Sequence, residues 1–176
     1  MERVGDTKLN RILKGMYWFI FLFYLFLLTL TVFLGRSEYR SVNLIPFQTI
    51  KDNILVDDGI RVHLVDISVW ANILMFIPAG IYIMFFSYNN SKRQAFYKVL
   101  ACTIFIETIQ YIFAIGAADV DDLILNGLGG AIGIAIYAMF FKVFKEKDKV
   151  EKAIAILSIL IGMSVLILFV LLRILN

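Results

Sequence analysis

Long apolar runs separated by short polar stretches dominate the chain. Five of these runs are long enough to cross a bilayer, because a helix of roughly 17 to 25 mostly apolar residues spans its hydrocarbon. The runs cover residues 16–34, 69–86, 99–115, 123–141 and 153–172. The pattern therefore predicts an all-α, polytopic integral membrane protein, a helical bundle of about five transmembrane helices.

The composition supports this prediction and excludes several kinds of site. The 176 residues are 61% hydrophobic and 18% charged, whereas soluble domains average about 45–50% and 25%. A single Cys and a single His exclude a disulfide within the chain and a zinc site built from Cys and His. No glycine-rich phosphate-binding loop is present. Any chemistry would therefore depend on carboxylates, amides, backbone groups and aromatic rings.

The basic residues predict how the helices are oriented. Twelve of the 17 Lys and Arg residues lie in residues 1–15, 87–98 and 142–152, and basic loops stay on the cytoplasmic side. The N-terminus is therefore predicted inside and the C-terminus outside. Because the basic residues are spread over three flanks rather than gathered in one patch, we expect no nucleic-acid partner.

This orientation divides the chain into segments. We expect a cytoplasmic N-terminal segment at residues 1–15, a transmembrane domain of four helices at 16–141, a basic cytoplasmic loop at 142–152, and a fifth, peripheral transmembrane helix at 153–176.

The long outer loop at residues 35–68 has internal structure of its own. Pro46 suits the first turn of a helix, and Phe47, Ile50 and Ile54 follow at helical spacing. This pattern predicts a short helix lying in the outer headgroup region. Farther along, the Asp-Gly pair at 58–59, between Ile54-Leu55-Val56 and Ile60-Arg61-Val62, predicts a hairpin.

Polar residues at or below the predicted outer face form the candidate site. Glu107 is the only charged residue inside any of the five runs, and Gln110 shares its helical face. Ionisable groups within spanning helices usually face the bundle interior or a water-filled cavity. The sequence therefore predicts an acidic, amide-lined pocket that opens to the outside and contains Asn72, Glu107, Gln110, Asp119, Asp121, Asp122 and Asn126.

Two interpretations of the carboxylates stay open. Asp119, Asp121 and Asp122 could hold a divalent cation, since hard cations prefer carboxylate oxygens. They could instead cap the following helix and interact with the positive end of its dipole. Glu107 could be a catalytic or proton-handling acid, or it could form a hydrogen bond to an amide on a neighbouring helix.

Small residues indicate where the helices pack. Gly129, Gly130 and Gly133 form a small-residue face, which in membranes allows the close approach of two helices. Pro78 and Gly80 lie near mid-depth in the second run. Pro78 removes a backbone donor and is more often a structural kink than a gate.

Four motifs, in this order along the chain, resemble the VanZ-like family. They read Asn43-Leu-Ile-Pro46-Phe47-Gln-Thr-Ile50, Asn72-Ile-Leu-Met-Phe76-Ile-Pro78-Ala-Gly80, Glu107-Thr-Ile-Gln110, and Asp119-Val-Asp121-Asp122-Leu-Ile-Leu-Asn126-Gly-Leu-Gly-Gly130-Ala-Ile-Gly133.

The resemblance implies a small multi-pass protein of the bacterial cell membrane. A named member of the family confers low-level resistance to the lipoglycopeptide teicoplanin. The motifs also add Asn43, Pro46 and Phe47 to the ligand-binding candidates. One position departs from the family, because relatives often carry an Arg three residues before the first Asp, where this chain has Gly116. Any pairing of that Arg with the carboxylates or with a ligand phosphate is therefore in doubt for this chain.

Three classes of function are compatible with these residues. The favoured hypothesis is a non-catalytic membrane protein whose pocket binds a lipoglycopeptide or a lipid-linked cell-envelope precursor among the membrane lipids. The second is an enzyme acting on lipid-linked phosphate or glycan, with a cation held by the three aspartates and Glu107 as acid or base. The third is a lipid transporter, which would have to be an oligomer because five spans lack a complete inverted repeat.

Overall fold

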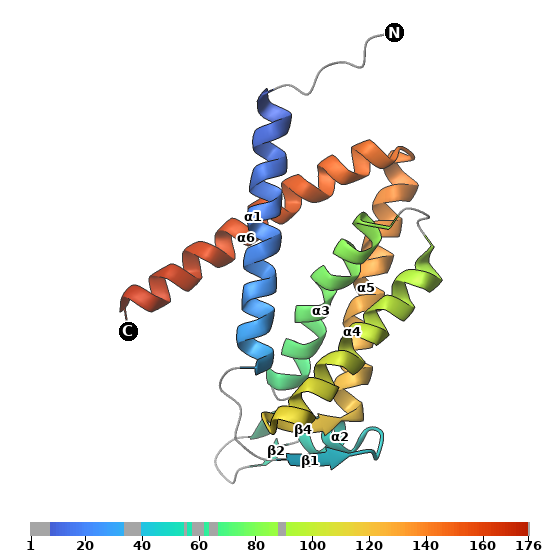
Figure 1. Ribbon diagram of the computed structural model, residues 1–176, viewed down its shortest axis with the longest axis vertical. Helices are drawn as coiled ribbons and strands as arrows, with labels where there is room; N and C mark the ends of the chain where they lie inside the picture. The colour runs from blue at the N-terminus through green and yellow to red at the C-terminus, as the bar shows by residue number, and fades with distance from the viewer. Residues whose placement is uncertain are drawn as a thin grey trace. The chain divides into compact units, whose positions relative to one another are not determined.

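The computed structural model describes residues 8–33, 40–54, 56–57, 62–63, 67–87 and 91–175, and helices dominate it (Figure 1). The helices are α1 (Lys8–Phe33), α2 (Gln48–Ile54), α3 (Ile67–Phe85), α4 (Lys92–Phe113), α5 (Val120–Phe144) and α6 (Lys147–Leu175). The strands are β1 (Arg40–Asn43), β2 (Val56–Asp57), β3 (Val62–His63) and β4 (Gly116–Asp119). All four strands are short, and the predicted all-α class is confirmed.

Each of the five predicted runs falls on one of the long helices. By length and composition, α1, α4, α5 and α6 can each cross a membrane, while α3 contributes a shorter apolar stretch, Val69–Phe85. The helices extend beyond the apolar runs where local capping allows it. For example, α4 begins at Lys92 because the side chain of Ser91 accepts a hydrogen bond from the backbone N–H of Gln94.

Contacts divide the chain into two compact units. One comprises Met1–Leu34 and Phe141–Asn176, and the other comprises Gly35–Phe140. The densest contacts of α1 are with α6. The grouping of residues 16–141 into one transmembrane domain stays a prediction.

The first unit, which we call the α1–α6 unit, is built from two helices that are apolar over most of their length and charged near their first turns. They come close at Gly162, where an added Cβ would lie 2.3 Å from Cγ2 of Ile20. Farther along, the ring of Phe169 meets those of Phe23 and Phe26 edge to face, with centroids 6.1 Å and 6.4 Å apart. Most other apolar side chains of α6 are exposed, as lipid-facing side chains would be.

The second unit, residues 35–140, depends on glycines where α5 crosses α3. A Cβ at Gly133 would lie 2.1 Å from the carbonyl oxygen of Ile77, and one at Gly80 would lie 2.1 Å from that of Gly130. Gly129 is in the same situation against α3. The two backbones are therefore in direct contact, which residues with a Cβ would prevent. Pro78 lies inside α3 next to this contact.

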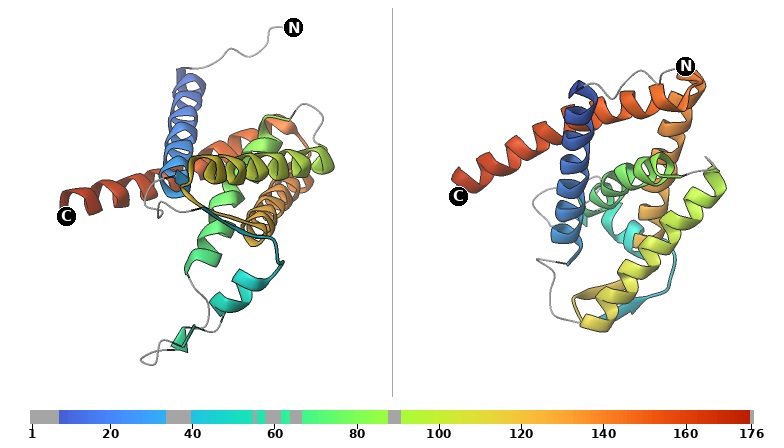
Figure 2. Two further views of the ribbon diagram at one scale, coloured as in Figure 1. Left: turned by 60° about the horizontal axis from the view of Figure 1, so that its bottom comes forward. Right: turned by 45° about the horizontal axis from the view of Figure 1, so that its top comes forward.

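The strands and α2 gather at the end of this unit where α4 ends and α5 begins (Figures 1 and 2). We call residues 40–54 and 116–119 the cap. Within it β1 pairs in parallel with β4, and Asn43 lies opposite Asp119. The chain reverses after α4 through Ala114, whose left-handed backbone (φ 57°) directs its N–H to the carbonyls of Gln110 and Tyr111.

Residues 40–63 show one difference from expectation and one agreement. The short helix begins at Gln48 rather than Pro46, because Phe47 has a φ of 65°, which an α-helix cannot include. The predicted hairpin is present as the antiparallel pairing of β2 with β3; its tip, with the Asp-Gly pair, lies outside the described residues.

Candidate functional site

Asp119 connects three elements of the cap. It precedes the first residue of α5, and its Oδ1 accepts a hydrogen bond from the backbone N–H of Asp121 (2.8 Å), the geometry of an N-cap. The same oxygen accepts from Nδ2 of Asn43 on β1 (3.1 Å). Oδ2 accepts from Oγ1 of Thr49 on α2 (2.6 Å). The Asp119 carboxylate therefore caps α5 and also connects β1 and α2 to the start of that helix.

Asp121 lies on α5 but accepts hydrogen bonds at the start of another helix, α2. Its side chain is completely buried, and its two oxygens accept from the backbone N–H groups of Phe47 (2.5 Å) and Ile50 (3.0 Å) at the start of α2. The first residues of a helix have N–H groups without intrahelical partners. Asp121 on α5 satisfies two such donors of α2 and fixes the approach of the chain to it.

Asp122 completes the set by connecting α5 to α3. Its Oδ1 accepts a hydrogen bond of 2.5 Å from Nδ2 of Asn72. The three aspartates therefore bind different partners, and two of them, Asp119 and Asp121, accept from backbone N–H groups at helix starts. Within the parts of the chain that the structure describes, no three His, Cys, Asp or Glu side chains are grouped to hold a metal ion. The cation site stays a prediction.

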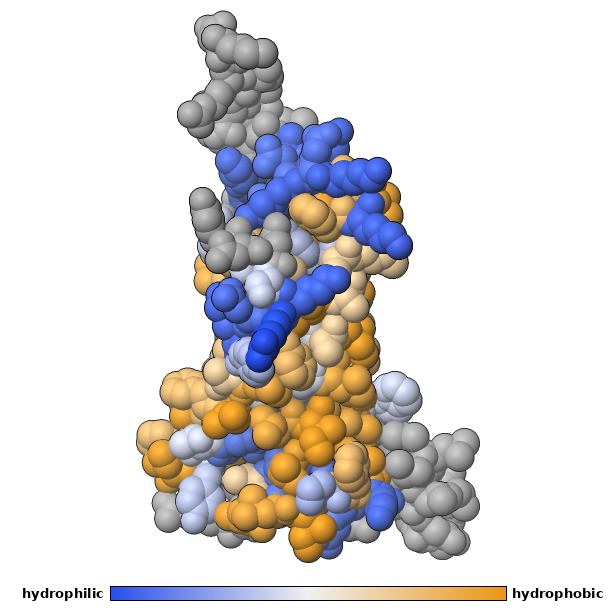
Figure 3. Space-filling model, turned by 90° about the vertical axis from the view of Figure 1, so that its right-hand side faces the viewer, coloured by the Kyte–Doolittle hydropathy of each residue, from blue (hydrophilic) through white to orange (hydrophobic). Residues whose placement is uncertain are grey.

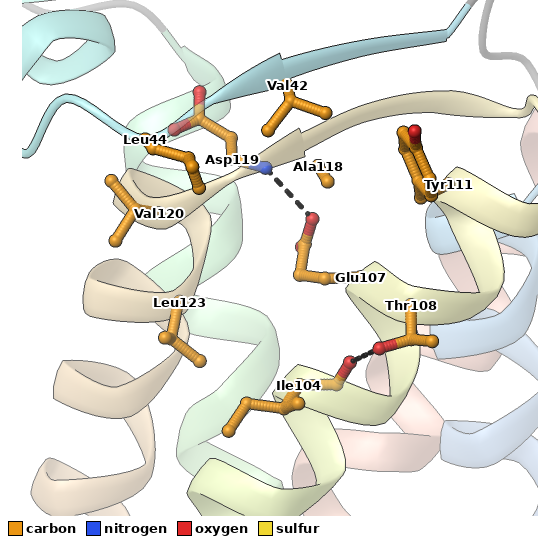
Figure 4. A pocket seen from close by; sticks show the side chains of 10 residues that line it. All are labelled: Val42, Leu44, Ile104, Glu107, Thr108, Tyr111, Ala118, Asp119, Val120 and Leu123. Atoms are coloured by element: carbon orange, nitrogen blue, oxygen red, sulfur yellow. Dashed lines mark hydrogen bonds between the residues drawn. The ribbon is translucent and has the colours of Figure 1, made fainter.

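Glu107 reaches from α4 toward the cap, at the edge of a pocket of about 380 Å³. Its Oε2 accepts a hydrogen bond of 3.2 Å from the backbone N–H of Asp119, as Figure 4 shows. Glu107 lies six residues before the end of α4, which is about 9 Å along the helix axis. The pocket lies between α4, α5, β1 and β4, and its lining consists of Val42, Leu44, Ile104, Glu107, Thr108, Tyr111, Ala118, Asp119, Val120 and Leu123.

The walls of this pocket are mainly apolar and partly exposed. Val42 and Ile104 are about half exposed, at 51% and 52%, and Leu44 is 75% exposed. In Figure 3 apolar side chains cover most of this end of the visible face, with scattered hydrophilic ones between them. The pocket is therefore an open apolar recess with two carboxylates, those of Glu107 and Asp119, on its wall.

Only two of the seven residues predicted to form the pocket line it, Glu107 and Asp119. Gln110 and Asn126 are instead buried among the helices. Nδ2 of Asn126 donates to Oγ1 of Thr103 (2.9 Å) and connects α5 to α4. Asn72 and the other two aspartates make the contacts given above. The seven polar residues predicted to form one pocket are therefore distributed over several contacts between helices and strands.

Sequence reasoning missed the apolar lining. One signal was available, because Ile104, Thr108 and Tyr111 recur at the spacing of a single helical face that also includes Glu107. The contribution of β1 and β4 had no such signal, since it depends on pairing between segments more than 70 residues apart. Pro46 and Phe47, predicted as ligand-binding residues, are exposed on the cap and do not line the pocket.

Comparison with known proteins places these residues in a family. The family described as VanZ/LLP1 matches residues 13–145. Protein VanZ of Enterococcus faecium is 33% identical over 130 residues, which represent 73% of this chain and 71% of that protein. No solved structure gives a significant match. The matched region includes every residue that lines the pocket.

Proposed function

This chain belongs to the VanZ-like family, and from that premise we propose that its pocket binds a lipidated amphiphile at the outer face of the bacterial cell membrane. Two ligands have this chemistry: a lipoglycopeptide antibiotic of the teicoplanin type and a lipid-linked precursor of the cell envelope. Binding would withhold the drug from its target or shield the precursor. The observation that carries this proposal is the open apolar pocket with Glu107 on its wall.

The two parts of the pocket suit the two parts of such a ligand. Its exposed apolar wall includes Val42 on the cap and Ile104 on α4, against which an acyl chain can lie without leaving the hydrocarbon. Glu107 offers a carboxylate to an amine or another hydrogen-bond donor, and charge-assisted bonds of this kind are strong where water is scarce. A soluble ligand without an acyl chain would contact only the carboxylate, so we expect it to bind weakly.

Drug susceptibility of cells tests the proposal. A sensitive bacterium that expresses this chain should tolerate more teicoplanin than the same strain without it, while its susceptibility to vancomycin, which has no acyl chain, should stay unchanged. An equal response to both drugs would contradict the proposal.

Three variants locate the binding site. Ile104→Trp fills the pocket, whereas Phe105→Trp changes the next residue, which is 65% exposed and does not line it. We expect the first to abolish resistance and the second to leave it intact at matched protein levels. Glu107→Gln keeps an acceptor for the N–H of Asp119 but removes the charge, so it should weaken binding of teicoplanin to the purified protein in lipid nanodiscs. Unchanged binding in both Ile104→Trp and Glu107→Gln would place the ligand elsewhere.

A further inference from the structure

A short turn in the cap presents apolar side chains outward. Residues 44–47 connect β1 to α2, and Leu44, Ile45 and Phe47 are 75%, 63% and 53% exposed; Pro46 between them is also exposed. Folded chains rarely place four such residues in succession at a water-exposed tip, because each loses the benefit of burial. The turn therefore has the surface of a segment that contacts another apolar phase.

The backbone of the turn is also suited to an apolar surrounding. The N–H of Ile45 donates to Oδ1 of Asn43 (3.1 Å), and the N–H of Phe47 donates to Asp121. Pro46 has no N–H to satisfy. The carbonyls of Ile45 and Phe47 accept from the backbone N–H groups of Gln48 and Lys51. Irregular backbone can enter hydrocarbon only where its polar groups are satisfied within the protein. These hydrogen bonds satisfy both backbone groups of Ile45 and of Phe47.

Phe47 adds a conformational argument. Its φ of 65° lies in the left-handed region, which a bulky residue occupies only when its surroundings enforce it. The enforcing group is the buried Asp121 carboxylate, which accepts from Phe47 and Ile50 together. The strained turn directs the Phe47 ring outward rather than into the unit. The cap thus maintains an exposed aromatic side chain at a cost in backbone energy.

The surface of α4 indicates which phase the turn meets. By length and composition α4 can cross a membrane, and its C-terminal end lies at the cap. Its exposed apolar side chains include Phe105, Ile112 and Phe113, and a spanning helix presents such side chains to the acyl chains. Ile104 on α4 and Leu44 on the turn line the same pocket. The exposed apolar side chains of the turn therefore continue a surface that meets hydrocarbon.

We infer that residues 44–47 are a rigid wedge inserted into the hydrocarbon of the adjacent leaflet, with the lipid bilayer itself as its partner. Val42 and Leu44 line the pocket, so the wedge places the pocket's cap side at acyl-chain depth. The exposed Gln48 and Lys51 on α2 lie outside the wedge and mark the polar limit of insertion. This inference concerns a surface of the protein without ligand and does not depend on the proposed function.

Spin-label depth measurements test the wedge directly. In a Cys102→Ser background, which removes the exposed native thiol, a nitroxide label is attached at Leu44→Cys or Ile45→Cys. Phe105→Cys on the exposed face of α4 is the lipid reference, and Lys51→Cys on α2 is the polar reference. The full chain is reconstituted without ligand in vesicles of phosphatidylcholine and phosphatidylglycerol. The accessibility of each label to oxygen and to a water-soluble nickel chelate is then measured by power saturation.

We expect the labels at 44 and 45 to have an oxygen-to-nickel accessibility ratio several-fold above that at 51 and close to that at 105. A ratio equal to that at 51 would overturn the wedge. Dipolar broadening between labels at 44 would overturn it as well, because a second copy of the chain would then cover the turn. The vesicles hold no lipoglycopeptide, so either outcome leaves the proposed ligand to its own test.

Discussion

The two compact units use their polar side chains in different ways. In the α1–α6 unit, the hydroxyls of Thr29, Thr31 and Ser164 donate to backbone carbonyls four residues earlier in the same helix. In residues 35–140 several polar side chains cross between elements, as Asp121 does from α5 to α2 and Asn126 from α5 to α4, while Thr108 bonds within α4. Hydrogen bonds of the crossing kind specify which elements meet, whereas bonds within one helix do not.

Their glycines show the same contrast. A Cβ added at Gly133 would meet backbone, namely the carbonyl of Ile77 on α3. A Cβ added at Gly162 would meet the side chain of Ile20, and one added at Gly15 would have nothing within 4 Å. A side chain can rotate away, while a backbone can move only with its helix. The pocket-bearing unit is therefore the less tolerant of the two.

Alanine at these three glycines gives the largest expected effect. Gly133→Ala should lower the free energy of unfolding by about 3 kcal/mol, at the upper end of overpacking costs, because α3 and α5 must separate. At Gly162 a cost of about 1 kcal/mol is offset by the similar gain in helix propensity. Gly15→Ala should be neutral or slightly stabilising. Thermal unfolding in one detergent ranks the three variants; a Gly162→Ala protein as unstable as Gly133→Ala would remove the contrast between the units.

The next largest effect is expected at Asp121. Asp121→Ala leaves the N–H groups of Phe47 and Ile50 without their acceptor, which should cost about 2 kcal/mol. Asp121→Asn keeps one acceptor oxygen and should cost less. As a control, Glu146→Ala removes an exposed carboxylate paired with Lys149 and should change stability by no more than about 0.5 kcal/mol.

Hydrogen exchange shows where the Asp121 variants lose structure. Faster amide exchange should be confined to residues 43–50, with α1 and α6 unaffected. Exchange that rises equally in both units would mean that Asp121 supports the whole chain rather than the cap alone.

The helices could be predicted from sequence because their signal is local. Each predicted run lies on a helix of the structure, and α6 differs only by extra turns at its ends, over Lys147–Leu175. Apolar length alone determines such helices. The β1–β4 pair could not be predicted in this way, because four residues of Gly-Ala-Ala-Asp carry no strand pattern and their partner lies far away in sequence.

The candidate site was predicted less well than the fold. The sequence places three aspartates at one helix start, and their proximity there suggests a shared ligand. Their partners are instead Thr49 and Asn43, the N–H groups of α2, and Asn72, which lie on three other elements. Helix geometry separates the side-chain directions of Asp121 and Asp122, but only the tertiary structure shows which partners lie in each direction. Glu107 was identified because a carboxylate inside an apolar run is conspicuous on its own.

The smallest predicted effect compares two threonines in different units. Thr103 is fully buried and accepts a hydrogen bond from Asn126 on another helix; Thr103→Val should cost roughly 0.6 kcal/mol, the average for such bonds between membrane helices. The hydroxyl of Thr29 donates within α1, so Thr29→Val of the same shape should cost almost nothing. A double-mutant cycle with Asn126→Ala, measured by unfolding, isolates the Thr103 interaction. Zero coupling there would mean that this hydrogen bond does not help to specify how α4 meets α5.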